Sequence, residues 1–322
     1  MNPPFAPLFD RRLVVISGKG GVGRTTVAAA LARAAADDGK RVLIAASAPT
    51  DRLGHLYGRA PLGRTVTTLA PGIDAVNMTP ESALREYGVL TLRSELVARA
   101  LLENRAARSF LNAVPGLDAY AILGKAWWHT TERTNGRPRY DLTILDGPAS
   151  GHAALMLRIP GAILAAMPKG PLATDARAID ELLRDPVQAA LVIVTLPEEL
   201  PAREAGELAA ALRELHLPLG PLVVNAVPSE DAAAAALTPI LDRAAAAGDS
   251  TLGALGATLR LTIAARAHRR IAEQTIAGLR RDLGLPILSL PRLPTVDVGP
   301  PGIATLASHF GRDPQRVPLP PR

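Results

Sequence analysis

The chain has 322 residues, 48% of them hydrophobic, and contains no cysteine. This composition supports one large or two smaller folded domains and excludes global disorder, disulfides, thiolate zinc sites and a cysteine nucleophile. The net charge is +6, but all except four of the 36 basic residues are scattered arginines and aromatic residues make up only 3%, so nucleic-acid binding is not expected.

Short apolar runs alternate with longer helical patterns along the chain. The runs are continuously apolar, which is typical of strands that helices cover on both faces. Strand and helix in alternation predict an α/β fold with a doubly wound, mostly parallel sheet. The predicted strands cover residues 13–17, 41–45, 73–77, 142–145, 190–195, 222–225 and 287–290.

Helical patterns without strands predict an insertion into this domain. Stretches at 81–87, 92–112 and 117–132 place the insertion at about 80–135, within a single domain of residues 11–311. Its apolar residues could line a groove, but packing onto the sheet is the favoured interpretation. The pattern of residues 231–283 predicts a second helical region, and residues 312–322 predict a proline-rich disordered tail.

Targeting signals are not evident in the sequence. The first twelve residues lack the apolar segment of a signal peptide, and no apolar run reaches the length of a membrane-spanning helix. A cytoplasmic protein without a direct membrane anchor is therefore expected.

The most informative stretch is the glycine-rich sequence SGKGGVGRTT at residues 17–26, which follows the first strand and opens a helix. Such a turn points backbone N–H groups at an anion, and the helix N-terminus adds its positive dipole end. The phosphate-loop pattern is met with Arg24 at the position of the usual lysine, and Thr25 would place a hydroxyl on Mg²⁺. The other predicted phosphate-binding residues are Gly18, Gly20, Gly21, Val22, Gly23 and Thr26.

This loop resembles the deviant Walker A motif, KGGxGKT, of the ParA, MinD and ArsA group of dimeric P-loop ATPases. The segment YDLTILDGPASGH at residues 140–152 is similar to the YDxxxxDxxPTGH segment of the ArsA-like branch, and PGLD at residues 115–118 matches a piece of that branch's helical insertion. The resemblance spans about residues 11–311. It implies a P-loop ATPase of the arsenite-pump or tail-anchored-protein-targeting type, with ATP and Mg²⁺ as cofactors.

The resemblance also implies roles for individual residues. Lys19, Arg24 and Asp146 would be the catalytic residues. Lys19 would reach the nucleotide of a partner subunit, while Thr25 and Asp146 would hold Mg²⁺, the carboxylate acting through water.

Three further residues correspond to nucleotide contacts of the family. Gly151 matches the glycine that senses the γ-phosphate, and Asn225 matches the asparagine that reads adenine. Pro294 lies in a stretch, residues 291–303, that resembles the loop covering the base.

The sequence departs from the family pattern at three places. Arg24 replaces a compact lysine with a planar guanidinium. Ala48 stands where the family has the aspartate that positions water, and Asp51 could replace it only if the loop folds differently, although a turn or cap role is favoured for it. The arsenite-binding thiols and the zinc-binding CxxC of the family have no counterpart.

Three functions follow from this pattern. The first is an ArsA-like ATPase that binds Mg-ATP at a dimer interface and rearranges its helical insertions to handle a client or a membrane-protein partner. The second is a non-hydrolysing nucleotide-binding subunit paired with a catalytically complete paralogue. The third is a positioning protein like MinD or ParA, which the proline-rich end disfavours because MinD uses an amphipathic helix there. The dimer would be a homodimer, or a heterodimer with an ArsA-like paralogue.

Overall fold

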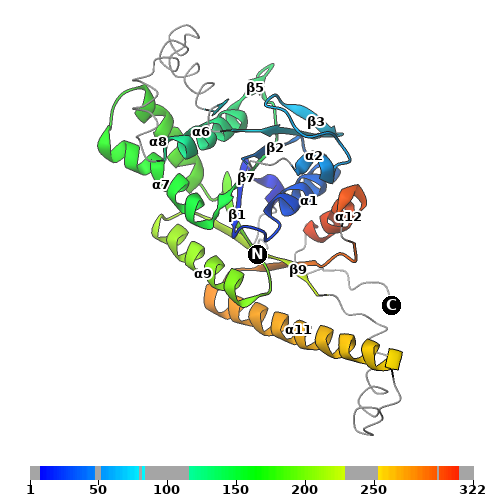
Figure 1. Ribbon diagram of the computed structural model, residues 1–322. Helices are drawn as coiled ribbons and strands as arrows, with labels where there is room; N and C mark the ends of the chain where they lie inside the picture. The colour runs from blue at the N-terminus through cyan, green and yellow to red at the C-terminus, as the bar shows by residue number, and fades with distance from the viewer. Residues whose placement is uncertain are drawn as a thin grey trace, which may run out of the picture.

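The computed structural model describes residues 8–47, 52–79, 82–83, 116–228, 253–295 and 297–311. At its centre is an eight-stranded sheet in the order β10-β9-β8-β1-β7-β2-β4-β3 (Figure 1). All neighbouring pairs are parallel except β3 and β4, which are antiparallel. The strands are β1 (Leu13–Gly18), β2 (Val42–Ala46), β3 (Thr67–Ala70), β4 (Ile73–Asn77), β7 (Leu142–Ala149), β8 (Ala189–Thr195), β9 (Leu219–Val227) and β10 (Ile287–Pro291).

Alternate residues of each inner strand supply two separate cores. In β1, Leu13 and Val15 pack into one buried cluster, whereas Val14 and Ile16 pack into the other. Side chains point alternately to the two faces of a strand, so a run that is apolar throughout is stable only when helices cover both faces. The predicted doubly wound α/β sheet is therefore confirmed.

Two groups of helices cover the two faces of the sheet (Figure 1). One face is covered by α1 (Arg24–Asp37), α2 (Leu53–Leu56) and α12 (Gly299–Ala307). The opposite face is covered by α6 (Leu117–Thr131), α7 (Ser150–Ala166), α8 (Pro171–Arg184), α9 (Glu199–Glu214) and α11 (Gly253–Leu283). The remaining described elements are the 3₁₀ turns Leu8–Asp10 and Ser308–Phe310 and the short hairpin of β5 (Arg133–Thr134) and β6 (Arg137–Pro138).

All seven predicted strands are present, but the sequence pattern missed β3. This strand lies at the sheet edge, and only Leu69 among its four residues is buried, so it has no apolar run. Of the predicted insertion, α6 is confirmed at its expected position, whereas residues 84–115 lie outside the described part of the chain. The tail at 312–322 also lies outside it.

Helix α11 extends well beyond the sheet (Figure 1). Its C-terminal half packs along α9 and buries Ala272, Leu279 and Leu283. Farther toward its N-terminus, Ile263 and Ile271 are exposed.

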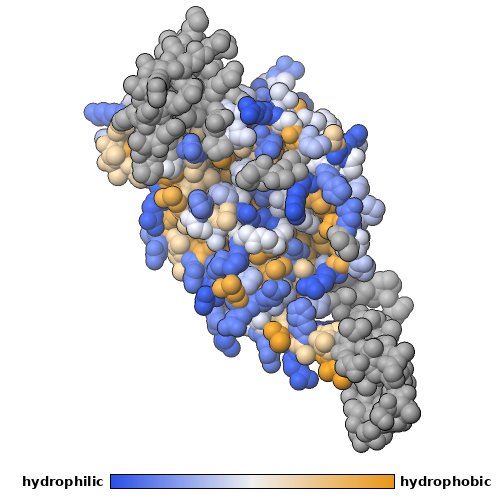
Figure 2. Space-filling model, viewed as in Figure 1, coloured by the Kyte–Doolittle hydropathy of each residue, from blue (hydrophilic) through white to orange (hydrophobic). Residues whose placement is uncertain are grey.

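The surface in Figure 2 intersperses hydrophilic and hydrophobic residues over the described part of the molecule. Within that part, no helix combines the length and the hydropathy needed to cross a bilayer.

Candidate functional site

The glycine-rich loop lies between β1 and α1, at the carboxyl edge of the sheet. Gly21 and Gly23 have φ angles of +86° and +89°, a left-handed conformation that side chains disfavour. A Cβ atom on Gly23 would also collide with the amide of Asn225. At Gly20 and Gly21 a Cβ would meet nothing within 4 Å. The loop therefore leaves an open space lined by main chain, where an anion can approach the backbone N–H groups at the start of α1.

Thr25 and Asp146 meet beside this loop. The Thr25 hydroxyl donates a 2.7 Å hydrogen bond to Oδ2 of Asp146. Asp146 lies next to Ile16 in the pairing of β1 with β7, which places its carboxylate at the start of the loop. Only 3% of Asp146 is exposed, and this burial raises the pKa of its carboxyl group, against the opposing effects of the Thr25 hydrogen bond and the Arg24 charge.

These two oxygen donors fit a magnesium ion. Carboxylate and hydroxyl oxygens are the ligands that Mg²⁺ accepts together with substrate phosphates. Burying a charged carboxylate costs desolvation free energy, and a bound cation would offset that cost.

Arg24 bridges the loop and the end of β7. Its Nη1 donates a 2.7 Å hydrogen bond to the carbonyl of Gly147, the residue after Asp146. Burial lowers the pKa of the guanidinium, and the charge of Asp146 acts in the opposite direction. The side chain is thus held toward the strand that carries the Asp146 carboxylate.

Lys19 forms an ion pair that sequence reasoning missed. Its Nζ lies 2.5 Å from Oε1 of Glu204 in α9, and both side chains are about 30% exposed (30% and 28%). The two residues are 185 positions apart, and Glu204 is one of several charged residues on an amphipathic helix, so no local signal could have found it.

Asn225 contacts the loop from the end of β9. Its Nδ2 donates a 2.9 Å hydrogen bond to the carbonyl of Val22, and the residue is buried. The next residue, Ala226, has a φ of +53°, which turns the chain sharply at this point. The structure therefore brings Asn225 against the phosphate loop itself.

The other predicted residues are more dispersed. Thr26 lies in the first turn of α1 and Gly151 in the first turn of α7. Pro294 is exposed in the loop between β10 and α12. Ala48 and Asp51 are outside the described residues.

Two serines support the site from strand ends. Ser17 Oγ donates to the carbonyl of Pro148, and Ser47 Oγ donates to the carbonyl of Asp146, each at 2.9 Å. Each serine directly follows an apolar run, which is the signal that could have identified it.

A glycine loop between strand and helix, with an acidic residue at the end of the adjacent parallel strand, defines a P-loop NTPase. The chain belongs to the family of anion-transporting ATPases, whose model matches residues 11–173. The predicted ArsA-like membership is therefore confirmed, and a family of ATPases implies nucleotide binding.

Named relatives agree with this assignment. The chain is 30% identical to the ATPase BagA of Mycobacterium tuberculosis over 221 residues, which cover 66% of this chain and 64% of that protein. It is 29% identical to an arsenical pump-driving ATPase of Acidiphilium multivorum and 27% identical to one of Escherichia coli. Those matches cover 69% and 67% of this chain but only 41% and 40% of the two relatives.

Proposed function

We propose that this chain binds Mg-ATP at the loop of residues 17–26 and hydrolyses it. The observation that carries the proposal is the 2.7 Å contact between Thr25 and Asp146 beside a left-handed glycine turn. Thr25 and Asp146 would hold Mg²⁺, which supplies charge neutralisation between the phosphates. The N–H groups of Gly20 to Gly23 would bind phosphate oxygens, with Arg24 beside them.

The remaining roles follow from the family. Lys19 would leave Glu204 and stabilise charge on the nucleotide of a partner subunit, so the active species would be a dimer. Asn225 and Pro294 would contact the base, and Gly151 would respond to the γ-phosphate. Nucleotide state would then rearrange the helical insertion, which would handle a client or a membrane-protein partner.

Turnover by the purified chain tests this proposal. We expect Mg²⁺-dependent release of phosphate from ATP that Asp146→Asn abolishes. Asp141→Asn is a matched control, because Asp141 lies at the opposite end of β7 and pairs with Arg41. Absence of nucleotide binding in the wild-type chain, alone or with a cognate subunit, would refute the proposal.

A second function is a nucleotide-binding subunit that does not hydrolyse ATP alone. The contact of Arg24 with the Gly147 carbonyl favours it, since the loop's cation is engaged by β7. In that case the chain would bind ATP without turnover, and a paralogue with an intact loop lysine would restore activity. Arg24→Lys separates the two functions: a gain of turnover in the isolated chain supports the second, whereas measurable wild-type turnover that the variant keeps or lowers supports the first.

A further inference from the structure

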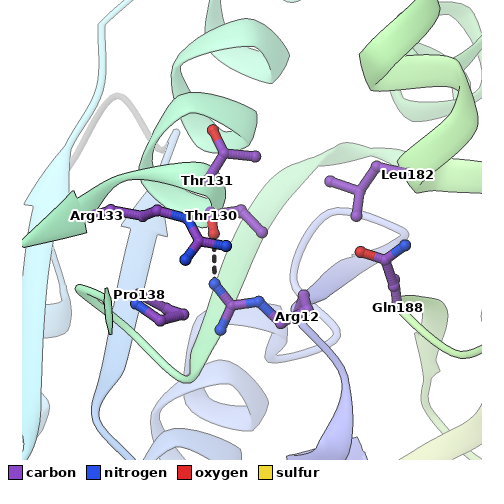
Figure 3. Close-up of a pocket in the computed structure, with 7 residues that line it drawn as sticks. All are labelled: Arg12, Thr130, Thr131, Arg133, Pro138, Leu182 and Gln188. Atoms are coloured by element: carbon purple, nitrogen blue, oxygen red, sulfur yellow. Dashed lines mark hydrogen bonds between the residues drawn. The ribbon is translucent and has the colours of Figure 1, made fainter. Parts of the chain in front are cut away.

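A cavity of about 200 Å³ lies at the edge of the sheet opposite the glycine-rich loop. The end of α6, the β5–β6 hairpin, α8 and the residues that precede β1 and β8 line it (Figure 3). The length of β1 separates it from the loop, about 20 Å for six residues at the usual rise of a strand. The cavity is therefore distinct from the proposed nucleotide site.

Arg12 forms one wall of this cavity. Its Nη1 donates to the carbonyls of Tyr140 and Asp141 at 2.6 and 2.9 Å. Its Nη2 donates to the carbonyl of Thr130 at 2.6 Å, the bond drawn in Figure 3. A guanidinium has five N–H donors, so two remain available. Burial lowers the pKa of Arg12, and the nearby charges of Arg133 and Arg41 act in the same direction against that of Asp141.

Arg133 presents a second guanidinium to the same cavity. In Figure 3 it lies next to the guanidinium of Arg12. It uses one N–H, which donates to the carbonyl of Gly136 at 2.9 Å. Four of its donors are therefore available.

No Asp or Glu is among the described residues that line the cavity. Both charged residues that line the cavity are arginines. In the described part of the chain neither forms an ion pair, because the neighbouring Asp141 pairs with Arg41 and Glu132 pairs with Arg139. Three carbonyl dipoles offset the charge of Arg12 in part, and Arg133 adds a full positive charge.

We propose that this cavity binds a tetrahedral oxyanion between the guanidinium groups of Arg12 and Arg133. Planar guanidinium forks match the oxygens of phosphate and sulfate, and two forks can serve one dianion. The space exceeds the roughly 30 Å³ share of a single water, which leaves room for an anion of several atoms. Free phosphate, sulfate and the phosphate end of a monoester share this chemistry.

The site would couple the anion to α6. Arg12 links the last turn of that helix to the residues just before β7, the strand that carries Asp146. An anion held by the remaining N–H groups of Arg12 would fix this link. Binding should therefore stabilise the folded chain by mass action.

The test is calorimetric titration of inorganic phosphate into the full chain with a non-hydrolysable analogue of Mg-ATP added in excess, so that its phosphates fill the glycine loop and inorganic phosphate does not enter it. We expect a dissociation constant of about 1 mM, weakened at least about five-fold by Arg133→Gln. Arg137→Gln is the matched control, because Arg137 is exposed in the same hairpin, carries the same charge and does not line the cavity. Arg133→Lys, which keeps the charge without the fork, should bind with intermediate affinity.

Three parallel titrations identify the chemistry. Sulfate binding like phosphate supports an inorganic oxyanion site, and phosphoserine binding more tightly than phosphate supports a monoester. Acetate binding as well as phosphate would overturn the tetrahedral assignment. Equal affinities of Arg133→Gln and Arg137→Gln, or no binding at about 50 mM phosphate, would overturn the site itself. If the Mg-ATP analogue does not bind, the nucleotide proposal fails, whereas comparison of the two arginine variants still decides this one.

Discussion

Two arginines lie at opposite ends of β1, and they make different contacts. Arg24 follows the carboxyl end of the strand, and its side chain donates a hydrogen bond to the Gly147 carbonyl beside Asp146. Arg12 precedes the amino end and ties three carbonyls from α6 and the start of β7 together. Burial lowers the pKa of both guanidinium groups.

The difference lies in the main chain around them. At the carboxyl edge, a Cβ on Gly20 or Gly21 would meet nothing within 4 Å, and the carboxylate of Asp146 is buried beside the loop. At the amino edge, the protein's own carbonyls occupy most of the donors of Arg12. Changes at the first edge should therefore affect nucleotide binding, whereas loss of Arg12 at the second edge should mainly affect stability.

The largest effect is expected at Gly23. Gly23→Ala places a Cβ against the amide of Asn225 in a left-handed backbone, and we expect nucleotide affinity to fall at least about 100-fold. Gly39→Ala is the control, since Gly39 has a φ of +85° and open space around it. Both variants should lose about 1 kcal/mol of stability from the backbone. Equal nucleotide affinities of the two variants, measured by fluorescence titration, would contradict the role of the loop.

The next effect should come from Arg12→Met. Three hydrogen bonds at about 1 kcal/mol each are lost, and retained packing offsets part of this, so we expect a decrease of about 2 kcal/mol in the free energy of unfolding. The neighbouring Arg11→Met removes one bond of 3.2 Å and should have a much smaller effect. Nucleotide affinity should stay the same in both. A large loss of nucleotide affinity in Arg12→Met would mean that the contacts of Arg12 are coupled to the glycine-rich loop at the other end of β1.

Asp146→Asn should abolish Mg²⁺-dependent nucleotide binding. The same change should nevertheless stabilise the protein in the absence of nucleotide and Mg²⁺. Burial raises the pKa of this carboxyl group, so the folded state binds its proton more tightly than the unfolded state does. The wild-type chain is therefore penalised as pH rises through the folded pKa. We expect an increase in Tm of about 2 °C at pH 8 that shrinks toward pH 5. A gain that is the same at both values would show that the carboxylate charge is not the cause.

The smallest effect should come from the Lys19–Glu204 pair. Glu204→Gln frees Lys19 for the nucleotide, so we expect affinity to rise a few-fold, about 1 kcal/mol or less for a partly exposed pair. In a Lys19→Met background the same change should have no effect, and this double-mutant cycle is the measurement that decides. If Glu204→Gln raises nucleotide affinity equally in that background, the cause is the net charge of α9 and not the release of Lys19.

Continuous apolar runs were sufficient to predict the buried strands, because a strand covered on both faces needs no polar alternation. They could not reveal β3, whose single buried residue, Leu69, leaves no pattern. The phosphate loop was predictable because glycine, threonine and a basic residue act there through local geometry. Thr25 and Asp146, which occur in separate motifs, were predicted as one site, and the structure brings them into contact.

The sequence by itself determined the class of fold and the place of the phosphate loop, since both depend on neighbours within a few residues. Only the tertiary structure decided that Lys19 meets Glu204, that Arg24 contacts Gly147, and that Arg12 and Arg133 share a cavity. Those contacts depend on how strands and helices that are distant in the chain pack together. For a charged residue on a helix surface or in a hairpin, the neighbouring sequence does not indicate which residue it will contact.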